Sequence, residues 1–148
     1  MIYDRRHTRL IDEFGGLADS LPVFSTIFMI VTFSSIGLPL LNGFVGEFLI
    51  LLGAFNANVT FAVVATSGVI LSAVYMLWMY QRVIFGEITN PKNKKLVDLD
   101  FREKLILLPL VALIFWMGIY SESFLRKMDT SVNQVLHHLK SSAVVVKN

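Results

Sequence analysis

A single carboxylate, Glu47, stands in a long stretch of apolar and small polar residues. No other Asp, Glu, Lys, Arg or His occurs between Ser20 and Gln81. A charged side chain at the centre of a membrane costs a few kcal/mol, and such residues commonly mark an ion or proton pathway. Burial favours the neutral form of a carboxyl group, so a buried glutamate can exchange protons near neutral pH. We therefore predict that Glu47 is a proton relay. The alternative is a protonated carboxyl group hydrogen-bonded between helices, without a role in transport.

The composition predicts a membrane protein. Apolar residues make up 55% of the chain and charged residues 16%, and the mean hydropathy is +0.65. Soluble domains are nearer a quarter charged. The net charge of +2 and the lack of a basic patch interleaved with aromatics predict no nucleic-acid partner. The chain has no cysteine, which excludes thiolate metal sites and Cys-ligated iron–sulfur clusters within it.

The hydropathy pattern predicts an all-α integral membrane protein. We expect one discontinuous transmembrane helix, two further transmembrane helices and a C-terminal amphipathic helix on the surface. The predicted ranges are 1–20 for a cytoplasmic polar arm, 21–120 for the transmembrane region and 122–148 for the amphipathic tail. Within the transmembrane region we expect a broken helix at 21–55, a helix at 59–86, a cytoplasmic loop at 87–103 and a helix at 104–121.

The first apolar block, residues 21–55, has the wrong length for a simple span. A straight helix of about 34 residues would be roughly 50 Å long, which is too long for one crossing and too short for two. Pro39 cannot continue a hydrogen-bonded helix, and Gly37, Asn42 and Gly43 lower helix propensity at the same place. We therefore predict a helix that is broken near Pro39. A tight hairpin of two short spans is the alternative.

Charge asymmetry favours the broken span over the hairpin. With a broken span, the arm and the middle loop bring nine of the 13 basic residues to one side, and the tail brings the other four to the opposite side. A hairpin would divide them seven to six. The positive-inside rule prefers the first arrangement, with the arm and the loop cytoplasmic. Glu47 then lies about 13 Å from the far surface, close to the membrane midplane.

Other polar groups give weaker signals. Arg82 is expected at the membrane edge, so no cationic partner for Glu47 is evident in this chain. His137 and His138 would point about 100° apart on a helix, and we predict no metal site there. The run from Tyr75 to Tyr80 is interpreted as a packing and lipid-facing surface, not as a quinone pocket. Small residues near Glu47 are expected to allow close helix approach or to admit water: Ser34, Ser35, Gly43 and Gly46.

Five motifs point to a known family. They are YDRRHTR at residues 3–9, GGL at 15–17, SIGLP at 35–39, GFVGEF at 43–48 and YMLWMYQRVIFG at 75–86. In content, order and spacing they resemble the subunit M (chain 4) family of the proton-translocating NADH-quinone oxidoreductase, respiratory complex I. The resemblance runs from the first residues to about Tyr120. The related subunits L and N and the Mrp-type antiporters usually carry a lysine where Glu47 stands.

The resemblance implies that the chain is the C-terminal part of an antiporter-like membrane subunit. Such subunits contain two inverted repeats, each with a discontinuous helix, and this chain would supply the second broken helix and the last two spans. The tail from about Glu122 would correspond to a C-terminal helix that braces the membrane arm. Met1 would then be an internal methionine, in a fragment or in one half of a split gene.

The function implied by the resemblance is proton translocation coupled to quinone reduction, with Glu47 as the proton relay. This chain would be a non-redox subunit without a cofactor, and FMN, the iron–sulfur clusters and the quinone would lie in other subunits. The implied partners are the L- and N-type antiporter-like subunits and the lipid bilayer, in the inner (cytoplasmic) membrane of a bacterium. The alternatives are an Mrp-type cation/proton antiporter subunit and a non-functional truncated membrane fragment.

Overall fold

The computed structural model describes residues 1–88 and 90–145, with side chains as far as residue 136. Within these residues all regular secondary structure is helical, as the sequence predicts. In chain order the elements are α1 (Ile2–Arg6), η1 (Ile11–Glu13), α2 (Leu17–Ser20), α3 (Pro22–Ser35), α4 (Asn42–Ala57), α5 (Val59–Ile84), η2 (Pro91–Lys95), α6 (Phe101–Ile119) and α7 (Glu122–Val145).

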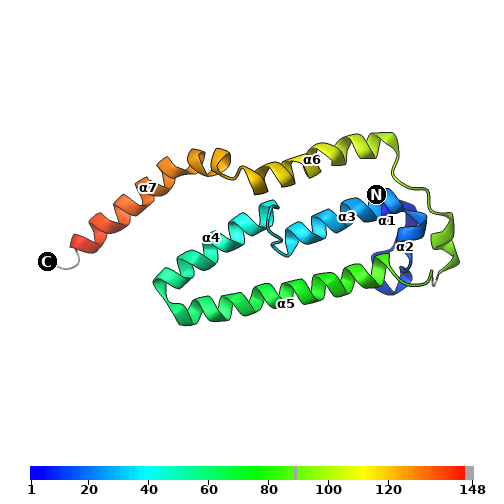
Figure 1. Ribbon diagram of the computed structural model, residues 1–148, viewed down its shortest axis with the longest axis horizontal. Coiled ribbons are helices and arrows are strands. Elements are labelled where there is room, and N and C mark those ends of the chain that lie inside the picture. The colour runs from blue at the N-terminus through cyan, green and yellow to red at the C-terminus, as the bar shows by residue number, and fades with distance from the viewer. Residues whose placement is uncertain (89, 146–148) are drawn as a thin grey trace.

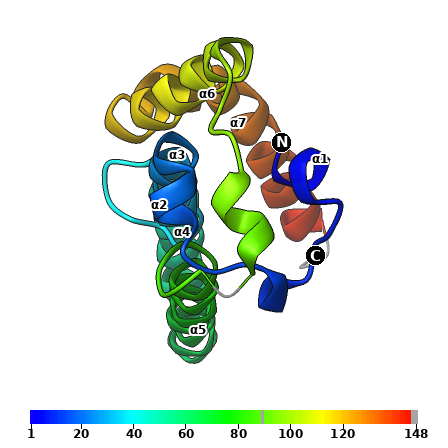
Figure 2. The ribbon, with the colours of Figure 1, turned by 90° about the vertical axis from the view of Figure 1, so that its right-hand side faces the viewer.

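The long helices form three layers, with α3 and α4 in the middle (Figures 1 and 2). α5 and α6 lie on opposite sides of this middle layer, and each of them contacts both α3 and α4. α4 continues in the direction of α3, and α5 returns antiparallel to both (Figure 1). α3 and α4 are therefore two halves of one broken helix and not the arms of a hairpin.

α5 is the longest apolar element and meets the length of a membrane span by itself. Its 26 residues correspond to about 39 Å. The side chain of Asn58 caps it by accepting hydrogen bonds from the backbone N–H groups of Thr60 (2.9 Å) and Phe61 (3.3 Å). Among the described residues it is the one helix that is long and apolar enough to cross a membrane unaided. α3 and α4 are shorter apolar helices, so the number of spans stays a prediction.

The break between α3 and α4 is built by a helix C-terminal motif around Gly37. The N–H of Leu38 donates to the carbonyl of Phe33 (3.0 Å), and the N–H of Gly37 donates to that of Ser34 (3.3 Å). These are the two hydrogen bonds of a Schellman motif, which requires a left-handed residue after the helix. Gly37 supplies it with φ +73°. Pro39 follows two residues later and prevents α3 from continuing through this segment, and α4 begins at Asn42.

Two glycines allow backbones to touch at the break. A Cβ atom on Gly43 would overlap the carbonyl group of Ser34, and one on Gly118 would overlap the backbone of Leu40 and Leu41. Gly118 lies near the end of α6, so α6 ends against the break. A Cβ on Gly46 would have no neighbour within 4 Å, so among the described residues this glycine borders open space and makes no close helix contact.

α7 follows α6 after a bend of 68° and extends away from the bundle (Figure 1). Exposed apolar side chains, among them Met128, Val132 and Val135, recur along it at helical spacing. This agrees with the predicted amphipathic tail, although its contact with a membrane or a subunit stays a prediction. α6 begins at Phe101 and ends at Ile119, a few residues before the predicted bounds of 104–121.

The N-terminal arm, expected to be a polar extension, is folded against one end of the bundle. Phe14 and Leu17 are buried there, and Leu17 is fully inaccessible to solvent. They form one apolar cluster with four residues from the start of α3 and the end of α5: Leu21, Tyr80, Val83 and Ile84. Hydrophobic burial therefore fixes the arm on α3 and α5.

Ionic contacts join this arm to the segment before α6. Arg5 forms a bidentate pair with Glu103, with Nη1–Oε1 and Nη2–Oε2 distances of 2.9 and 2.6 Å. Its Nε donates to the carbonyl of Val97 (2.9 Å). Paired forks of this kind are stronger and more directional than single hydrogen bonds. They hold the first turn of α6 beside α1.

Asp98 caps α3 from a distant part of the chain. Its carboxylate accepts hydrogen bonds from the N–H groups of Val23 (2.8 Å) and Phe24 (3.2 Å), at the second and third positions of that helix. Leu21, the residue at the N-cap position, provides no side-chain cap. Partial burial acts to raise the pKa of Asp98, but the N–H donors of Val23, Leu99 and Phe24 outweigh it and hold the pKa below its usual value.

Replacement of this cap predicts a pH-dependent loss of stability. Asp98→Ala should lower the free energy of unfolding by about 1 kcal/mol at pH 7, because two N–H groups of α3 lose their acceptor. Since the folded-state pKa is lowered, this stabilisation is present above the unfolded value near 3.8 and disappears as the pH falls through the folded value. Thermal unfolding of the purified protein in detergent at pH 7 and at low pH measures both effects. Asp19→Ala, an exposed carboxylate, is the control, and an equal loss for both variants would contradict the capping role.

Two glycine substitutions should have different effects on the free energy of unfolding. Gly37→Ala forces a left-handed residue to carry a Cβ, which costs about 1–2 kcal/mol before any overlap with its neighbours. Gly46→Ala fills open space in the interior of α4 and should be neutral or stabilising by up to about 1 kcal/mol. Thermal unfolding of both variants in the same detergent compares them. A Gly37→Ala protein as stable as Gly46→Ala would show that the turn at the break does not constrain the fold.

Candidate functional site

Glu47 lies in the second turn of α4 and reaches back to the break. Helical side chains lean toward the N-terminus of their helix, and the carboxylate of Glu47 accordingly lies against the backbone of Gly37. A Cβ atom on Gly37 would overlap this carboxylate, with its carboxyl carbon only 3.0 Å away. The side chain is partly buried. The predicted relay residue and the predicted break are therefore one site.

The break also brings backbone dipoles close to this carboxylate. α3 ends there with its carbonyl groups, and α4 begins there with N–H groups that receive no side-chain cap from Leu41. Such helix ends carry partial negative and partial positive charge respectively. The hydroxyl of Ser34 donates a hydrogen bond to Oδ1 of Asn42, which joins the two half-helices directly. The break to which Glu47 reaches back therefore contains groups that can donate and accept hydrogen bonds.

α3 carries further hydroxyl groups on its buried side. Thr32 is 1% exposed and Ser25 is also buried. Their side-chain oxygens have no hydrogen-bond partner within the part of the chain that the structure describes. Seven residues separate them, which is close to two helical turns, so they lie on one face. The Tyr80 hydroxyl donates to the backbone carbonyl of Ser25 at 3.2 Å. Buried hydroxyl groups of this kind are suitable partners for water.

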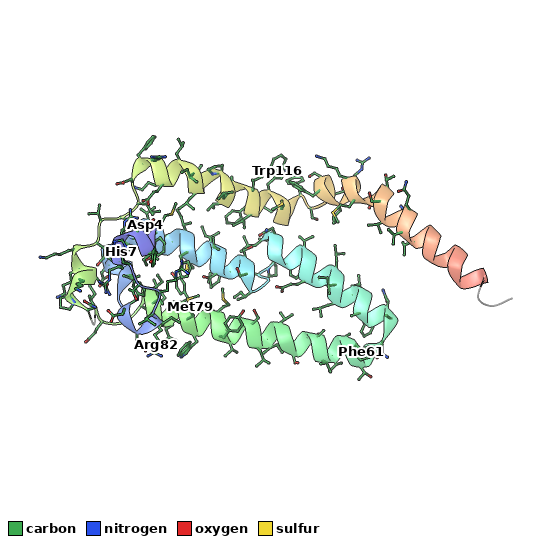
Figure 3. The ribbon with its side chains drawn as sticks, turned by 180° about the vertical axis from the view of Figure 1, so that it is seen from behind. Asp4, His7, Phe61, Met79, Arg82 and Trp116 are labelled. Carbon is green, nitrogen blue, oxygen red and sulfur yellow. The ribbon has the colours of Figure 1, made fainter. Side chains whose placement is uncertain are left out.

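Two ion pairs lie at the end of the bundle that holds the arm, where α3 begins. Arg82, in the last turn of α5, pairs with Asp12 at 2.6 Å, at the end of the bundle that holds the arm (Figure 3). Arg6 pairs with Glu13 at 3.3 Å in the same region. No ion pair within the described residues includes Glu47. Arg82 therefore lies at the end of its helix and is already paired, whereas its position at a membrane edge stays a prediction.

Metal binding receives no support from the described side chains. Residues 1–88 and 90–136 contain no group of three His, Asp or Glu residues placed to hold a metal ion. His137 and His138 lie outside the described side chains. The groups present at the break can exchange a proton at a carboxyl group, with hydroxyl, amide and backbone groups as hydrogen-bond partners.

The sequence identified Glu47 but not the groups that position it. Ser34 and Asn42 flank the break, and their polarity in an apolar stretch was the available signal for a link between them. Gly118 was a second missed signal, because a lone glycine in an apolar helix often marks a close backbone approach. Both contacts depend on how α3, α4 and α6 are rotated about their axes.

Comparison with known proteins agrees with this architecture. Residues 1–83 match the family model described as NADH:quinone oxidoreductase/Mrp antiporter, transmembrane. The chain is 46% identical over 139 residues to NADH-ubiquinone oxidoreductase chain 4 of Marchantia polymorpha. This alignment covers 94% of the present chain and 28% of the Marchantia protein. It is 52% identical over 120 residues to NADH-quinone oxidoreductase subunit M of Rhodobacter capsulatus, with 81% and 23% of the two chains covered.

A solved structure gives the same result for the fold. A chain of respiratory complex I from Thermus thermophilus, determined with bound NADH, superposes with a TM-score of 0.77 at 36% identity. The match covers 84% of this chain and 26% of that chain. The chain thus spans about a quarter of the length of the proteins that it matches. The family model covers more than half of its residues, and the chain belongs to the NADH:quinone oxidoreductase/Mrp antiporter transmembrane family.

Proposed function

We propose that this chain is part of the antiporter-like membrane subunit M of an NADH-quinone oxidoreductase, and that Glu47 relays a proton in that subunit. One observation carries the proposal: the isolated carboxylate of a long apolar stretch lies against the only break in its helix within the described residues. Intramembrane carboxyl groups in transport proteins commonly lie where a helix is interrupted. The names of the relatives, subunit M and chain 4, supply the class of complex.

The geometry suggests how the relay would operate. An interrupted helix leaves backbone groups that water can reach when the surrounding protein admits it. The carboxyl group of Glu47 would take up a proton through the hydrogen-bonding groups at the break, and would release it when a nearby charge or a change in hydration favours the anion. The Ser34–Asn42 link would hold the two half-helices in register while this occurs.

In this proposal the chain has no redox role of its own. The absence of cysteine from the sequence excludes Cys-ligated iron–sulfur clusters here. FMN, the clusters and the quinone site are assigned to other subunits, and the energy of quinone reduction would reach Glu47 as a change in the charge of its neighbours. The partners are the L- and N-type antiporter-like subunits and the lipid bilayer. The expected location is the inner (cytoplasmic) membrane of a bacterium.

A second candidate function is cation/proton exchange in an Mrp-type antiporter, since the matching family model includes that class. The relatives reported above are subunits of NADH oxidoreductases, which favours the first candidate. Glu47 favours it also, because the resemblance implies a lysine at this place in the antiporters. The third interpretation is a fragment without activity, since the chain spans about a quarter of the length of its relatives.

Removal of the exchangeable proton tests the relay. Glu47→Gln, made in the full-length subunit within its assembled complex, should lower proton pumping and coupled quinone reductase activity about tenfold or more, because an amide cannot accept and return the proton. Pumping in sealed vesicles and NADH-dependent quinone reduction are measured together. Blue-native electrophoresis should show normal assembly, since the amide keeps the size of the carboxyl group.

The matched control is Glu122→Gln, which alters an exposed carboxylate at the start of α7 and should leave pumping unchanged. Normal pumping in the Glu47→Gln complex would eliminate the relay. Sodium- or potassium-driven proton exchange without NADH would instead support the antiporter reading. If a complex assembled with the wild-type chain neither pumps protons nor exchanges ions, the result would support the interpretation of the chain as an inactive fragment.

A further inference from the structure

A pocket opens where α5 meets the folded arm. Its volume is ≈ 640 Å³, which is within the range of small-molecule sites. Residues of the arm, the last two turns of α5 and the segment after it line the pocket, and those with polar or aromatic side chains include Asp12, Trp78, Gln81, Arg82 and Glu87. Arg82 marks the position in Figure 3, at the end of the bundle that holds the arm. None of these residues takes part in the site around Glu47.

One exposed face of α5 leads from the middle of the helix to this pocket. Leu71, Tyr75, Trp78 and Arg82 are spaced by four, three and four residues, which places them on one face of the helix. The first three are 66%, 60% and 53% exposed. From Leu71 to Arg82 the helix rises by about 16 Å. Polarity changes along this face from aliphatic, through aromatic, to cationic.

This order of side chains matches the polarity of a phospholipid. Acyl chains contact aliphatic side chains, the ester region lies at the level of Tyr and Trp, and phosphate pairs with Arg or Lys at the membrane surface. α5 is the helix that meets the length and apolarity of a membrane span by itself. Its last turn, with Arg82, is therefore the place where a lipid head group would be found.

The charges in the pocket distinguish between head groups. The guanidinium of Arg82 pairs with Asp12 at 2.6 Å and lies over the ring of Trp78, 5.1 Å from its centroid. The pair uses one of its nitrogens, and an arginine has five N–H donors, so donors remain for a phosphate. Glu87 adds a second carboxylate. Two carboxylates and one guanidinium sum to −1, which disfavours a purely anionic head group and favours one that also carries an ammonium.

We propose that this pocket binds a phospholipid with an ethanolamine head group. Arg82 holds the phosphate, Asp12 and Glu87 hold the primary ammonium, and one acyl chain lies along Tyr75 and Leu71. This site is separate from proton relay at Glu47 and does not depend on it. A further helix of the full-length subunit is the competing occupant of this face, and the experiment distinguishes it from lipid.

The test measures lipid bound to the assembled complex that carries the full-length subunit. The complex is reconstituted in nanodiscs of equal phosphatidylethanolamine and phosphatidylglycerol, and extracted in a mild detergent. Native mass spectrometry then counts the retained lipids. The wild type should retain phosphatidylethanolamine, and Arg82→Gln should reduce this retention several-fold. Arg126→Gln, which removes an exposed charge from α7, should retain as much as the wild type.

A second variant tests the role of the carboxylates without touching Arg82. Asp12→Asn combined with Glu87→Gln changes the pocket charge from −1 to +1 and should shift retention toward phosphatidylglycerol. A photoreactive amino acid in place of Trp78 should form lipid adducts. Equal retention by Arg82→Gln and the wild type, a wild-type preference for phosphatidylglycerol, or photo-crosslinks to protein in place of lipid would each overturn the proposal.

Discussion

The interruption of the helix between Ser35 and Asn42 is the constraint on which the rest of the structure depends. An apolar environment offers no water to unpaired N–H and C=O groups, so a helix that stops inside it needs other partners. The Schellman motif at Gly37 satisfies carbonyl groups of α3, and the backbone contact at Gly118 brings α6 against the exposed turn. α5 and α6 also contact both halves of the broken middle layer.

Local signals in the sequence were sufficient for the helices and for the break. Pro39 and Gly37 act on their own backbone, and the lack of charge in α5 can be counted directly. The folded arm could not be predicted in the same way. Phe14 and Leu17 are two apolar residues in a charged segment, and they become a core only through contact with the end of α5. Asp98 caps a helix that begins some 75 residues earlier, which no local pattern records.

The candidate site likewise has one part that local sequence predicts and one part that depends on the fold. Glu47 was found because charge is rare in apolar sequence, a property of the residue and its neighbours in the chain. Its contact with Gly37 and the link between Ser34 and Asn42 depend on the rotation of α4 relative to α3. The conformation of residues 36–41 sets that rotation, including a left-handed Leu40 with φ +75°. The acid and the break in the helix can therefore be predicted from the sequence, whereas only the fold brings the two together.

The contact between Gly118 and the turn at Leu40 and Leu41 has a mechanical consequence. Side chains can change rotamer and absorb a small displacement, but here backbone meets backbone with no room even for a methyl group. A movement of the turn would therefore push directly on the end of α6. α7 begins within a few residues of that point and is about 36 Å long. A rotation of a few degrees at its base would move its far end by ångströms. A change in hydration or protonation that moves the turn would therefore displace residues well outside this bundle.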